Sequence, residues 1–221
     1  MRALIVAAAP VVGSSALVAA LAPEHDLVIA VDGGGRVCLD GNVTPDLVLG
    51  DFDSLAPTDL DALRDAGVRI STFPADKDRT DLELALAAAR EEGATDVTVT
   101  AVSSGRLDHT LAAVAALGHA PDLRPQIIEP EVRAWVLGAH ERSELLAGSL
   151  GDTISLISQG AGARVSIAGV RWPLDAHDLP EGSGLGVSNV VADSAGASVR
   201  VHAGTLLVVI PSPRGGVNGS W

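Results

Sequence analysis

Two aspartates, Asp51 and Asp53, follow the apolar run 47–49 and Gly50. Side chains two residues apart point the same way where the chain stays extended, so we expect these two carboxylates to converge. Like charges held that close repel each other unless a cation or a proton lies between them. Mg²⁺ takes carboxylate oxygens and leaves positions open for phosphate, so it is the expected occupant. The alternative is an aspartate-rich turn that caps the helix beginning near Pro57.

Small and charged residues follow the neighbouring apolar runs in the same way. Asp32-Gly33-Gly34-Gly35 comes after the run 27–31, and its glycines let backbone amides approach a ligand without obstruction by a Cβ atom. A plain glycine turn is the alternative explanation of this segment. The spacing is not that of a dinucleotide-binding fingerprint, so we do not interpret it as one.

The segment after the run 68–73 mixes charges of both signs, in the order Asp76-Lys77-Asp78-Arg79-Thr80-Asp81. Thr80 and Glu83 match a helix capping box, which explains both residues structurally. The capping box does not explain why Lys77 and Arg79 alternate with Asp78 and Asp81. A mixture of this kind at a helix N-terminus suits phosphate and metal together, so we expect the segment to contact a phosphorylated ligand.

The run 97–102 is followed by Gly105-Arg106-Leu107-Asp108-His109. Arg106 suits bidentate contacts to phosphate. Asp108 could serve as a helix cap, a metal ligand or a proton acceptor. The structural alternative is that Asp108 and His109 only cap the helix. Since no second histidine lies at helical spacing, we expect His109 to contact or orient a ligand rather than to bind a metal.

Short aliphatic runs alternate with helix-like stretches over residues 4–117. The expected strands are 4–9, 27–31, 47–49, 68–73 and 97–102, and the expected helices are 15–21, 36–40, 57–66, 81–92 and 108–117. Continuous apolar strands separated by helices are typical of an α/β fold, in which helices cover both faces of a mostly parallel sheet. Ligands gather beyond the carboxyl ends of such strands, and every charged segment described above falls there.

Beyond residue 121 the sequence favours short strands separated by Gly, Ser, Asp and Pro turns. The expected strands are 153–157, 163–167, 186–191, 198–201 and 206–210. Such spacing is typical of an antiparallel sandwich or barrel. We predict an α/β domain over 1–140, a smaller antiparallel β-sandwich domain over 141–211 and a loose tail over 212–221.

In this second region, Trp172, Ser188 and Asn189 combine one amphipathic aromatic ring with small hydrogen-bonding side chains. That combination suits a flat heteroaromatic ligand. A core tryptophan and a β-turn are the alternative interpretation.

Composition bears on several classes of function. The formal net charge of −13 argues against nucleic-acid binding, because a phosphate backbone needs a basic surface. The single cysteine, Cys38, permits no intrachain disulfide and fits a reducing cytoplasm. The apolar start resembles a signal peptide only faintly, since Pro10 and Gly13 interrupt it. No later segment reaches the ~20 apolar residues of a membrane span, so we expect no membrane partner.

Taken in order, these motifs resemble the thiamine diphosphokinase (thiamine pyrophosphokinase) family in its bacterial form. The matching segments are Val31-Asp32-Gly33-Gly34, residues 44–54, residues 77–86, residues 105–112 and Gly186-Val187-Ser188-Asn189. The resemblance implies an ATP-binding α/β domain, a β-sandwich domain, and a homodimer whose active sites lie between one subunit's α/β domain and the partner's sandwich. It also implies the reaction of ATP with thiamine to give AMP and thiamine diphosphate.

The resemblance assigns roles by motif. Its implied Mg²⁺ ligands are Asp51, Asp53 and Asp81. Its implied contacts to ATP are Asp32, Gly33, Gly34, Lys77, Asp78, Thr80, Arg106, Asp108 and His109. Its implied contacts to thiamine are Ser188, Asn189 and Trp172. The chain departs from the family pattern at Gly35-Arg36 and Ala113, and no aromatic residue directly follows the Ser188-Asn189 pair.

The chemistry of that reaction agrees with the residues. The hydroxyl of thiamine must attack the β-phosphorus of a polyanion, so the protein has to align the reactants and neutralise charge. Metal held by Asp51, Asp53 and Asp81, together with Arg106 and Lys77, would supply positive charge. The candidate general bases are Asp108 and Asp53.

Three other functions fit parts of this pattern. A pyrophosphokinase for another hydroxymethyl heterocycle, such as a pterin, would keep the acidic residues and change the second domain. A metal-dependent phosphoesterase would use water as the acceptor. A nucleotide or thiamine sensor would bind without turnover.

Overall fold

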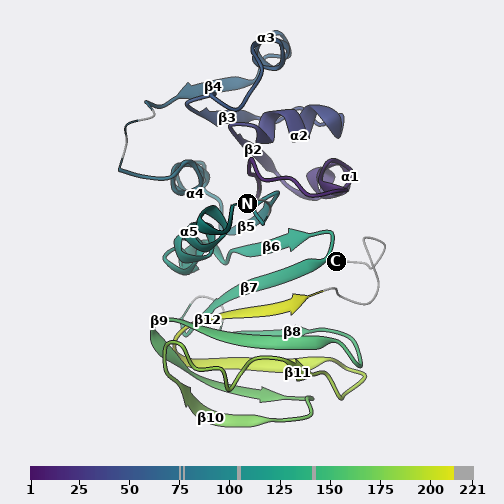
Figure 1. The fold of residues 1–221 in the computed structure, drawn as a ribbon, viewed down its shortest axis with the longest axis vertical. Helices are drawn as coiled ribbons and strands as arrows, with labels where there is room; N and C mark the ends of the chain where they lie inside the picture. Colours follow the sequence, from purple (N-terminus) through teal and green to yellow (C-terminus); the bar gives the residue numbers. More distant parts are fainter. Residues whose placement is uncertain (75, 77, 104–105, 141–142, 212–221) are drawn as a thin grey trace. The chain divides into compact units, whose positions relative to one another are not determined.

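The computed structural model describes residues 1–74, 76, 78–103, 106–140 and 143–211 (Figure 1). The chain divides into two compact units, the first spanning Met1–Ala116 and the second beginning at Leu117. The predicted domain limits at residues 140 and 211 stay predictions. No helix in the described part of the chain is long and apolar enough to cross a membrane.

The first unit is built on a parallel sheet in the strand order β5-β1-β2-β3-β4. Its strands are β1 (Arg2–Val6), β2 (Leu27–Val31), β3 (Leu47–Gly50), β4 (Arg69–Thr72) and β5 (Asp96–Thr100). Every residue of β2 and β3 is buried, as expected for strands covered on both faces. The parallel α/β sheet predicted from the sequence is therefore confirmed.

Helices alternate with these strands, and Figure 1 shows α1 and α2 on one side of the sheet and α4 on the other. Their bounds are α1 (Ser14–Leu21), α2 (Gly34–Asp40), α3 (Pro57–Asp65), α4 (Asp81–Glu91) and α5 (Leu107–Gly118), with a short 3-10 turn, η1 (Ala22–Glu24). The predicted stretches match within one or two residues. Pro57 begins α3, where its missing N–H would have no helical partner.

The carboxyl ends of these parallel strands lie at one edge of the sheet. The chain moves outward from β1 through β2 and β3 to β4, then returns to β5 on the other side of β1. Because all these strands run parallel, their carboxyl ends share one edge. Segments 32–35, 51–54 and 101–103 leave the sheet there, which is where ligands bind in folds of this class.

The second unit is antiparallel. Its elements are η2 (Pro121–Leu123), β6 (Gln126–Glu129), β7 (Val132–Gly138), β8 (Glu144–Ala147), β9 (Thr153–Ala168), β10 (Leu174–Leu179), β11 (Asn189–Val190) and β12 (Ala197–Pro211). Strand β12 pairs with β7, β8 and β9, while β9 also pairs with β10 and β11. The prediction of antiparallel strands after the α/β region is confirmed.

Two long strands, β9 and β12, replace four short ones expected from the sequence. We predicted breaks near residues 158–162 and 202–205, but the ladder between β9 and β12 continues across them with shifts in register. Gly160, Gly162 and Gly204 adopt positive φ at these shifts, so they bend continuous strands instead of ending them. Buried residues from both halves of each strand, such as Leu156 and Ile167, join one core.

Candidate functional site

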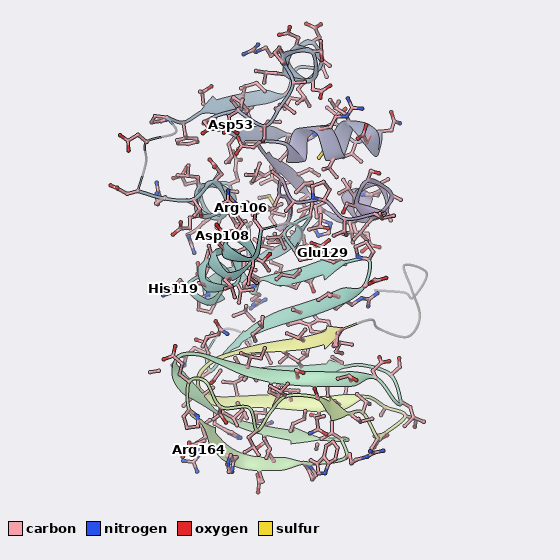
Figure 2. The ribbon with its side chains drawn as sticks, in the orientation of Figure 1. Asp53, Arg106, Asp108, His119, Glu129 and Arg164 are labelled. Carbon is pink, nitrogen blue, oxygen red and sulfur yellow. The ribbon has the colours of Figure 1, made fainter. Side chains whose placement is uncertain are left out.

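The turn after β3 does not stay extended, contrary to the premise of the sequence analysis. Gly50 has φ +148° and Phe52 has φ +62°, so the chain reverses between the two aspartates. The backbone N–H of Asp53 donates to Oδ1 of Asp51 over 3.2 Å. Asp51 is half-buried and Asp53 is exposed at the carboxyl end of β3 (Figure 2). The two carboxylates therefore lie in different surroundings.

Asp32 at the end of β2 is the most buried acidic side chain of the predicted site, with 8% of its surface exposed. Its backbone N–H donates to the carbonyl of Leu49 over 3.0 Å, which ties the ends of β2 and β3 together. Its Oδ1 accepts the N–H of Phe52 over 3.1 Å. A Cβ atom on Gly50 would overlap Oδ1 of Asp32, so the glycine before Asp51 makes room for the neighbouring carboxylate.

Asp32, Asp51 and Asp81 influence one another electrostatically. The pKa of Asp32 is raised from 3.8 to about 6, first by burial and then by the nearby charges of Asp81 and Asp51, against the opposing hydrogen bond from Phe52. Asp81 also shares a side-chain hydrogen bond with Asp32. The ends of β2 and β3 and the start of α4 thus bring three carboxylates from separate segments together.

The three carboxylates bear on the predicted metal site. Among the described residues, no group of three or more His, Cys, Asp or Glu side chains is poised to hold a metal ion. The mutual repulsion around Asp32 is nevertheless the situation that a bound cation relieves, so these carboxylates fit a divalent metal. The assignment of Asp51, Asp53 and Asp81 as ligands stays a prediction.

Gly33 and Gly34 also contribute hydrogen bonding and close packing to the fold. The N–H of Gly33 donates to Oγ of Ser54 over 3.0 Å, which joins the turn after β2 to the turn after β3. A Cβ atom on Gly34 would collide with the carbonyl oxygen of Val6 at the end of β1. Close packing of α2 on β1 therefore accounts for Gly34 without a ligand, while Gly33 lies at the edge where a ligand would bind.

The start of α4 is fixed by the predicted capping box. Oγ1 of Thr80 accepts the N–H of Glu83, and the Glu83 carboxylate accepts the N–H of Thr80. This explains Thr80 structurally and holds Asp81 at the first position of the helix. Asp78 is exposed, and Lys77 lies outside the described residues.

Arg106 and Asp108 form an exposed ion pair at the start of α5 (Figure 2). The guanidinium donates from Nη2 to Oδ2 of Asp108 over 2.5 Å and from Nε to Oδ1 over 3.2 Å. These hydrogen bonds lower the pKa of Asp108 to about 2. In this arrangement Asp108 is a weak proton acceptor, and Arg106 is occupied by a carboxylate where a phosphate would fit. His109 beside them is exposed.

In the second unit, Trp172 and Asn189 lie together. Trp172 is 56% exposed, and the guanidinium of Arg171 lies 5.4 Å from the centre of its ring. Asn189 is buried, and its amide bonds to the backbone of Trp172. The predicted grouping of these two residues is present, and Asn189 faces the protein interior.

Ser188, adjacent to Asn189, has the opposite character. It is exposed and adopts φ +60°, a conformation that residues other than glycine rarely adopt. Its N–H donates to Oγ of the buried Ser155 over 3.0 Å. Ser155 could not be identified from the sequence, because a serine in the middle of an apolar strand carries no signal of its distant partner.

A shallow cavity of about 520 Å³ lies at the opposite, amino-terminal edge of the parallel sheet. It is lined by residues such as Asp46, Arg69 and Glu92, with Arg69 and Glu92 paired over 2.6 Å. None of the predicted site residues lines it. The cavity is thus separate from the acidic edge, the carboxyl edge of the sheet at which Asp32, Asp51 and Asp81 lie.

Two models of known protein families match this chain. The model described as "Thiamin pyrophosphokinase, catalytic domain" matches residues 18–128, and the model described as "Thiamin pyrophosphokinase, vitamin B1 binding domain" matches residues 141–206. The chain belongs to the thiamin pyrophosphokinase family. The resemblance inferred from the motifs is confirmed.

Individual members of the thiamin pyrophosphokinase family agree. A thiamine pyrophosphokinase of Bacillus subtilis (strain 168) is 28% identical over 176 residues, covering 78% of this chain and 82% of the relative. The crystal structure of the Bacillus subtilis enzyme has a TM-score of 0.79 at 24% identity and covers 96% of this chain and 99% of its own. That of the Geobacillus thermodenitrificans protein has a TM-score of 0.77 at 25% identity, with coverage of 98% and 100%.

Proposed function

We propose that this chain carries out the reaction of its family with Mg²⁺ as the metal, in the cytoplasm. The reaction transfers the pyrophosphoryl group of ATP to the hydroxyl of thiamine. The observation that carries the proposal is the convergence of Asp32, Asp51 and Asp81 at the carboxyl edge of a parallel sheet, within the stretch that matches the family's catalytic domain. An acidic edge of this kind suits metal-bound polyphosphate.

The bonding changes define what the site must do. The oxygen of the thiamine hydroxyl forms a bond to the β-phosphorus, and the bond from that phosphorus to the bridging oxygen on the α-phosphorus breaks. AMP leaves with that oxygen, and the hydroxyl proton passes to a base. The chain has no need of a covalent intermediate, so alignment and charge compensation are its main tasks.

The acidic residues divide this work between them. Asp51, Asp53 and Asp81 would hold Mg²⁺, which supplies positive charge against the phosphate oxygens when bound. Asp32 keeps the turn after β3 in place through its bond to the N–H of Phe52. The capping box of Thr80 places Asp81 at the helix start.

Arg106 and Asp108 act as a pair. The phosphates of ATP compete with the Asp108 carboxylate for the guanidinium, because both are anions that accept two parallel hydrogen bonds. When Arg106 turns to phosphate, Asp108 loses the interaction that depresses its pKa and becomes a better proton acceptor. We therefore propose Asp108 as the base, with Lys77, Asp78 and His109 as further contacts to ATP.

For the acceptor, we propose that thiamine lies against the exposed ring of Trp172 and within reach of Ser188. The active form would be a homodimer, in which the α/β domain of one subunit faces the second domain of its partner.

Thiamine-dependent release of AMP tests the function directly. Purified protein with ATP and Mg²⁺ is expected to form AMP and thiamine diphosphate only when thiamine is added. Phosphate release without thiamine would indicate a phosphoesterase. AMP release with a hydroxymethyl pterin in place of thiamine would indicate another pyrophosphokinase, and binding without turnover would indicate a sensor.

A further inference from the structure

We propose that Asn189 is a positioning residue, which sets the place of Trp172 without itself touching the acceptor. This inference rests on the proposed function, because it concerns the site in which thiamine would bind. It separates two neighbours, Ser188 and Asn189, that the sequence presents as one motif.

The amide of Asn189 clamps the backbone of Trp172 from both sides. The N–H of Trp172 donates to Oδ1 of Asn189 over 3.1 Å, and Nδ2 of Asn189 donates to the carbonyl of Trp172 over 2.6 Å. This reciprocal pair reproduces the bonding between two strands. It continues the neighbouring pairing, in which the N–H of Arg171 donates to the carbonyl of Val190 over 2.9 Å.

The side-chain amide of Asn189 has little hydrogen-bonding capacity left for a ligand. Oδ1 also accepts the N–H of Val190 over 2.9 Å, so it accepts two hydrogen bonds, the usual number for an amide oxygen. One N–H of Nδ2 is used by Trp172. With 7% of the residue exposed, Asn189 is directed toward the chain and away from solvent. A buried amide with this many partners is part of the architecture.

Trp172, in contrast, is anchored by its backbone and open at its side chain. The residue is 56% exposed, and the guanidinium of Arg171 lies 5.4 Å from the centre of its ring. An aromatic ring on a fixed backbone offers a flat surface at a low cost in conformational entropy. No aromatic residue follows Asn189 directly in the sequence. The ring beside it is that of Trp172, which lies in the connection between β9 and β10.

Ser188 provides the exposed polar side chain of the Ser188–Asn189 corner, by which we mean Trp172, Ser188 and Asn189. Its N–H is held by Ser155, its φ is +60°, and its side chain is exposed. The reversal of direction between Ser188 and Asn189 explains why adjacent residues do different work. Ser188 is available to a ligand, while Asn189 acts through Trp172.

A double-mutant cycle tests this assignment in the full chain. Variants Asn189→Ala, Trp172→Ala and the combination of both are assayed for AMP formation at saturating ATP and Mg²⁺ across a thiamine series. We expect each single variant to raise KM for thiamine about tenfold, with KM for ATP unchanged within about twofold. We expect the double variant to match Trp172→Ala alone, because the two changes remove the same interaction.

Ser158→Ala is the matched control. Oγ of Ser158 also donates to a backbone carbonyl, that of Pro180, over 2.9 Å, and the residue is equally buried in the second unit. Its hydroxyl bonds to Pro180 and not to Trp172, so Ser158→Ala should lose comparable stability and keep the KM for thiamine. Equal KM changes in Ser158→Ala and Asn189→Ala would reduce the effect to general destabilisation and overturn the proposal.

A spectroscopic measurement gives a result that does not depend on turnover. In a background with Trp135→Phe and Trp221→Phe, the fluorescence of Trp172 reports its own mobility. Asn189→Ala is expected to lower the steady-state anisotropy of Trp172, and Ser158→Ala is expected to leave it unchanged. Asn189→Asp, which keeps the acceptor and loses the donor to the Trp172 carbonyl, should fall between Asn189→Ala and the parent, and serves if Asn189→Ala does not fold.

These outcomes separate two kinds of failure. If the parent protein shows no thiamine-dependent AMP release, the proposed function is wrong, and the anisotropy still decides whether Asn189 holds Trp172. If the parent is active but the single effects multiply to about a hundredfold in the double variant, Asn189 contacts thiamine independently and the inference is wrong. An unchanged anisotropy in Asn189→Ala would overturn it as well.

Discussion

The acidic edge of the first unit and the Ser188–Asn189 corner of the second unit treat polar side chains in different ways. At the acidic edge, burial raises the pKa of Asp32, and the nearby charges of Asp81 and Asp51 raise it further. At the corner, the amide of Asn189 is satisfied by the backbone of its own unit. The first arrangement needs a partner from outside the chain to reach its lowest energy, and the second does not. We infer that the first region performs the chemistry and the second shapes a surface.

The largest expected effect comes from Asp51→Asn. Removing one carboxylate from the acidic edge should lower kcat for AMP formation by about 10³-fold or more, because the metal and phosphates lose a fixed charge. The circular dichroism spectrum should stay unchanged. Asp61→Asn is the control, since Asp61 is an exposed carboxylate on α3 that pairs with Arg64 over 3.0 Å. Near-parental activity in Asp51→Asn would refute the metal role and with it the contrast between the regions.

Gly50→Ala should have the next largest effect. The added Cβ atom overlaps Oδ1 of Asp32, and φ is +148° at this position, so the turn after β3 has to shift. We expect a loss of about 2–4 kcal/mol in the free energy of unfolding and about a hundredfold loss of turnover.

Gly67→Ala provides the comparison for that variant. Gly67 also has positive φ, at +79°, but no atom lies within 4 Å of the place of its Cβ. Its substitution should cost about 1 kcal/mol from backbone strain and leave turnover unchanged. If both alanine variants lose the same stability and activity, the crowding around Asp32 has no special role.

Asp32→Asn should change stability in a pH-dependent way. Folding raises the pKa of Asp32 from 3.8 to about 6, so the folded state holds the proton more tightly than the unfolded state. The resulting cost is fully present above pH 6 and disappears as the pH falls toward 4. In metal-free buffer at pH 8, the variant should therefore be more stable than the parent by up to about 3 kcal/mol, the free energy of a pKa shift from 3.8 to about 6, and should melt up to about 6–12 °C higher. Near pH 4 the two proteins should melt at about the same temperature. A difference that is constant with pH would contradict the crowding of carboxylates.

The smallest effect is expected from Thr80→Ala. Losing the capping box should cost about 1 kcal/mol of stability, measured by thermal unfolding. Turnover should fall by only a few-fold, because Asp81 remains at the helix start. Thr58→Ala on α3 is the control, since the side chain of Thr58 is exposed and α3 has no side-chain cap. A larger loss of activity than in Gly50→Ala would show that Thr80 contacts ATP directly.

Much of the first unit follows from its sequence. Its strands are nearly continuous apolar runs, and strong signals such as Pro57 and the Thr80–Glu83 pair mark where helices begin. The clustering of Asp32 and Asp81 also follows, because parallel strands deliver their ends to one edge. The reversal at Phe52 does not follow, since a left-handed aromatic residue has no local signature.

The second unit was harder to predict. Glycines such as Gly160 and Gly204 are read as turns, although here they bend strands that continue on both sides. Strand β10 (Leu174–Leu179) was missed because half of its residues are polar and only one is fully buried, so it lacks an apolar run. The inward direction of Asn189 depends on Trp172, which is distant in the sequence. Long-range pairing of this kind leaves no periodic pattern to detect.

The continuity of β9 and β12 has a consequence for how the second unit forms. Each strand contributes to both halves of a single core, so neither half is complete while the other is missing. Strand β9 cannot be fully paired until β12 arrives, after two other strands and their loops have passed. Such distant pairing makes assembly slow and leaves an apolar strand edge open to other chains in the meantime. Aggregation during synthesis should therefore begin at β9.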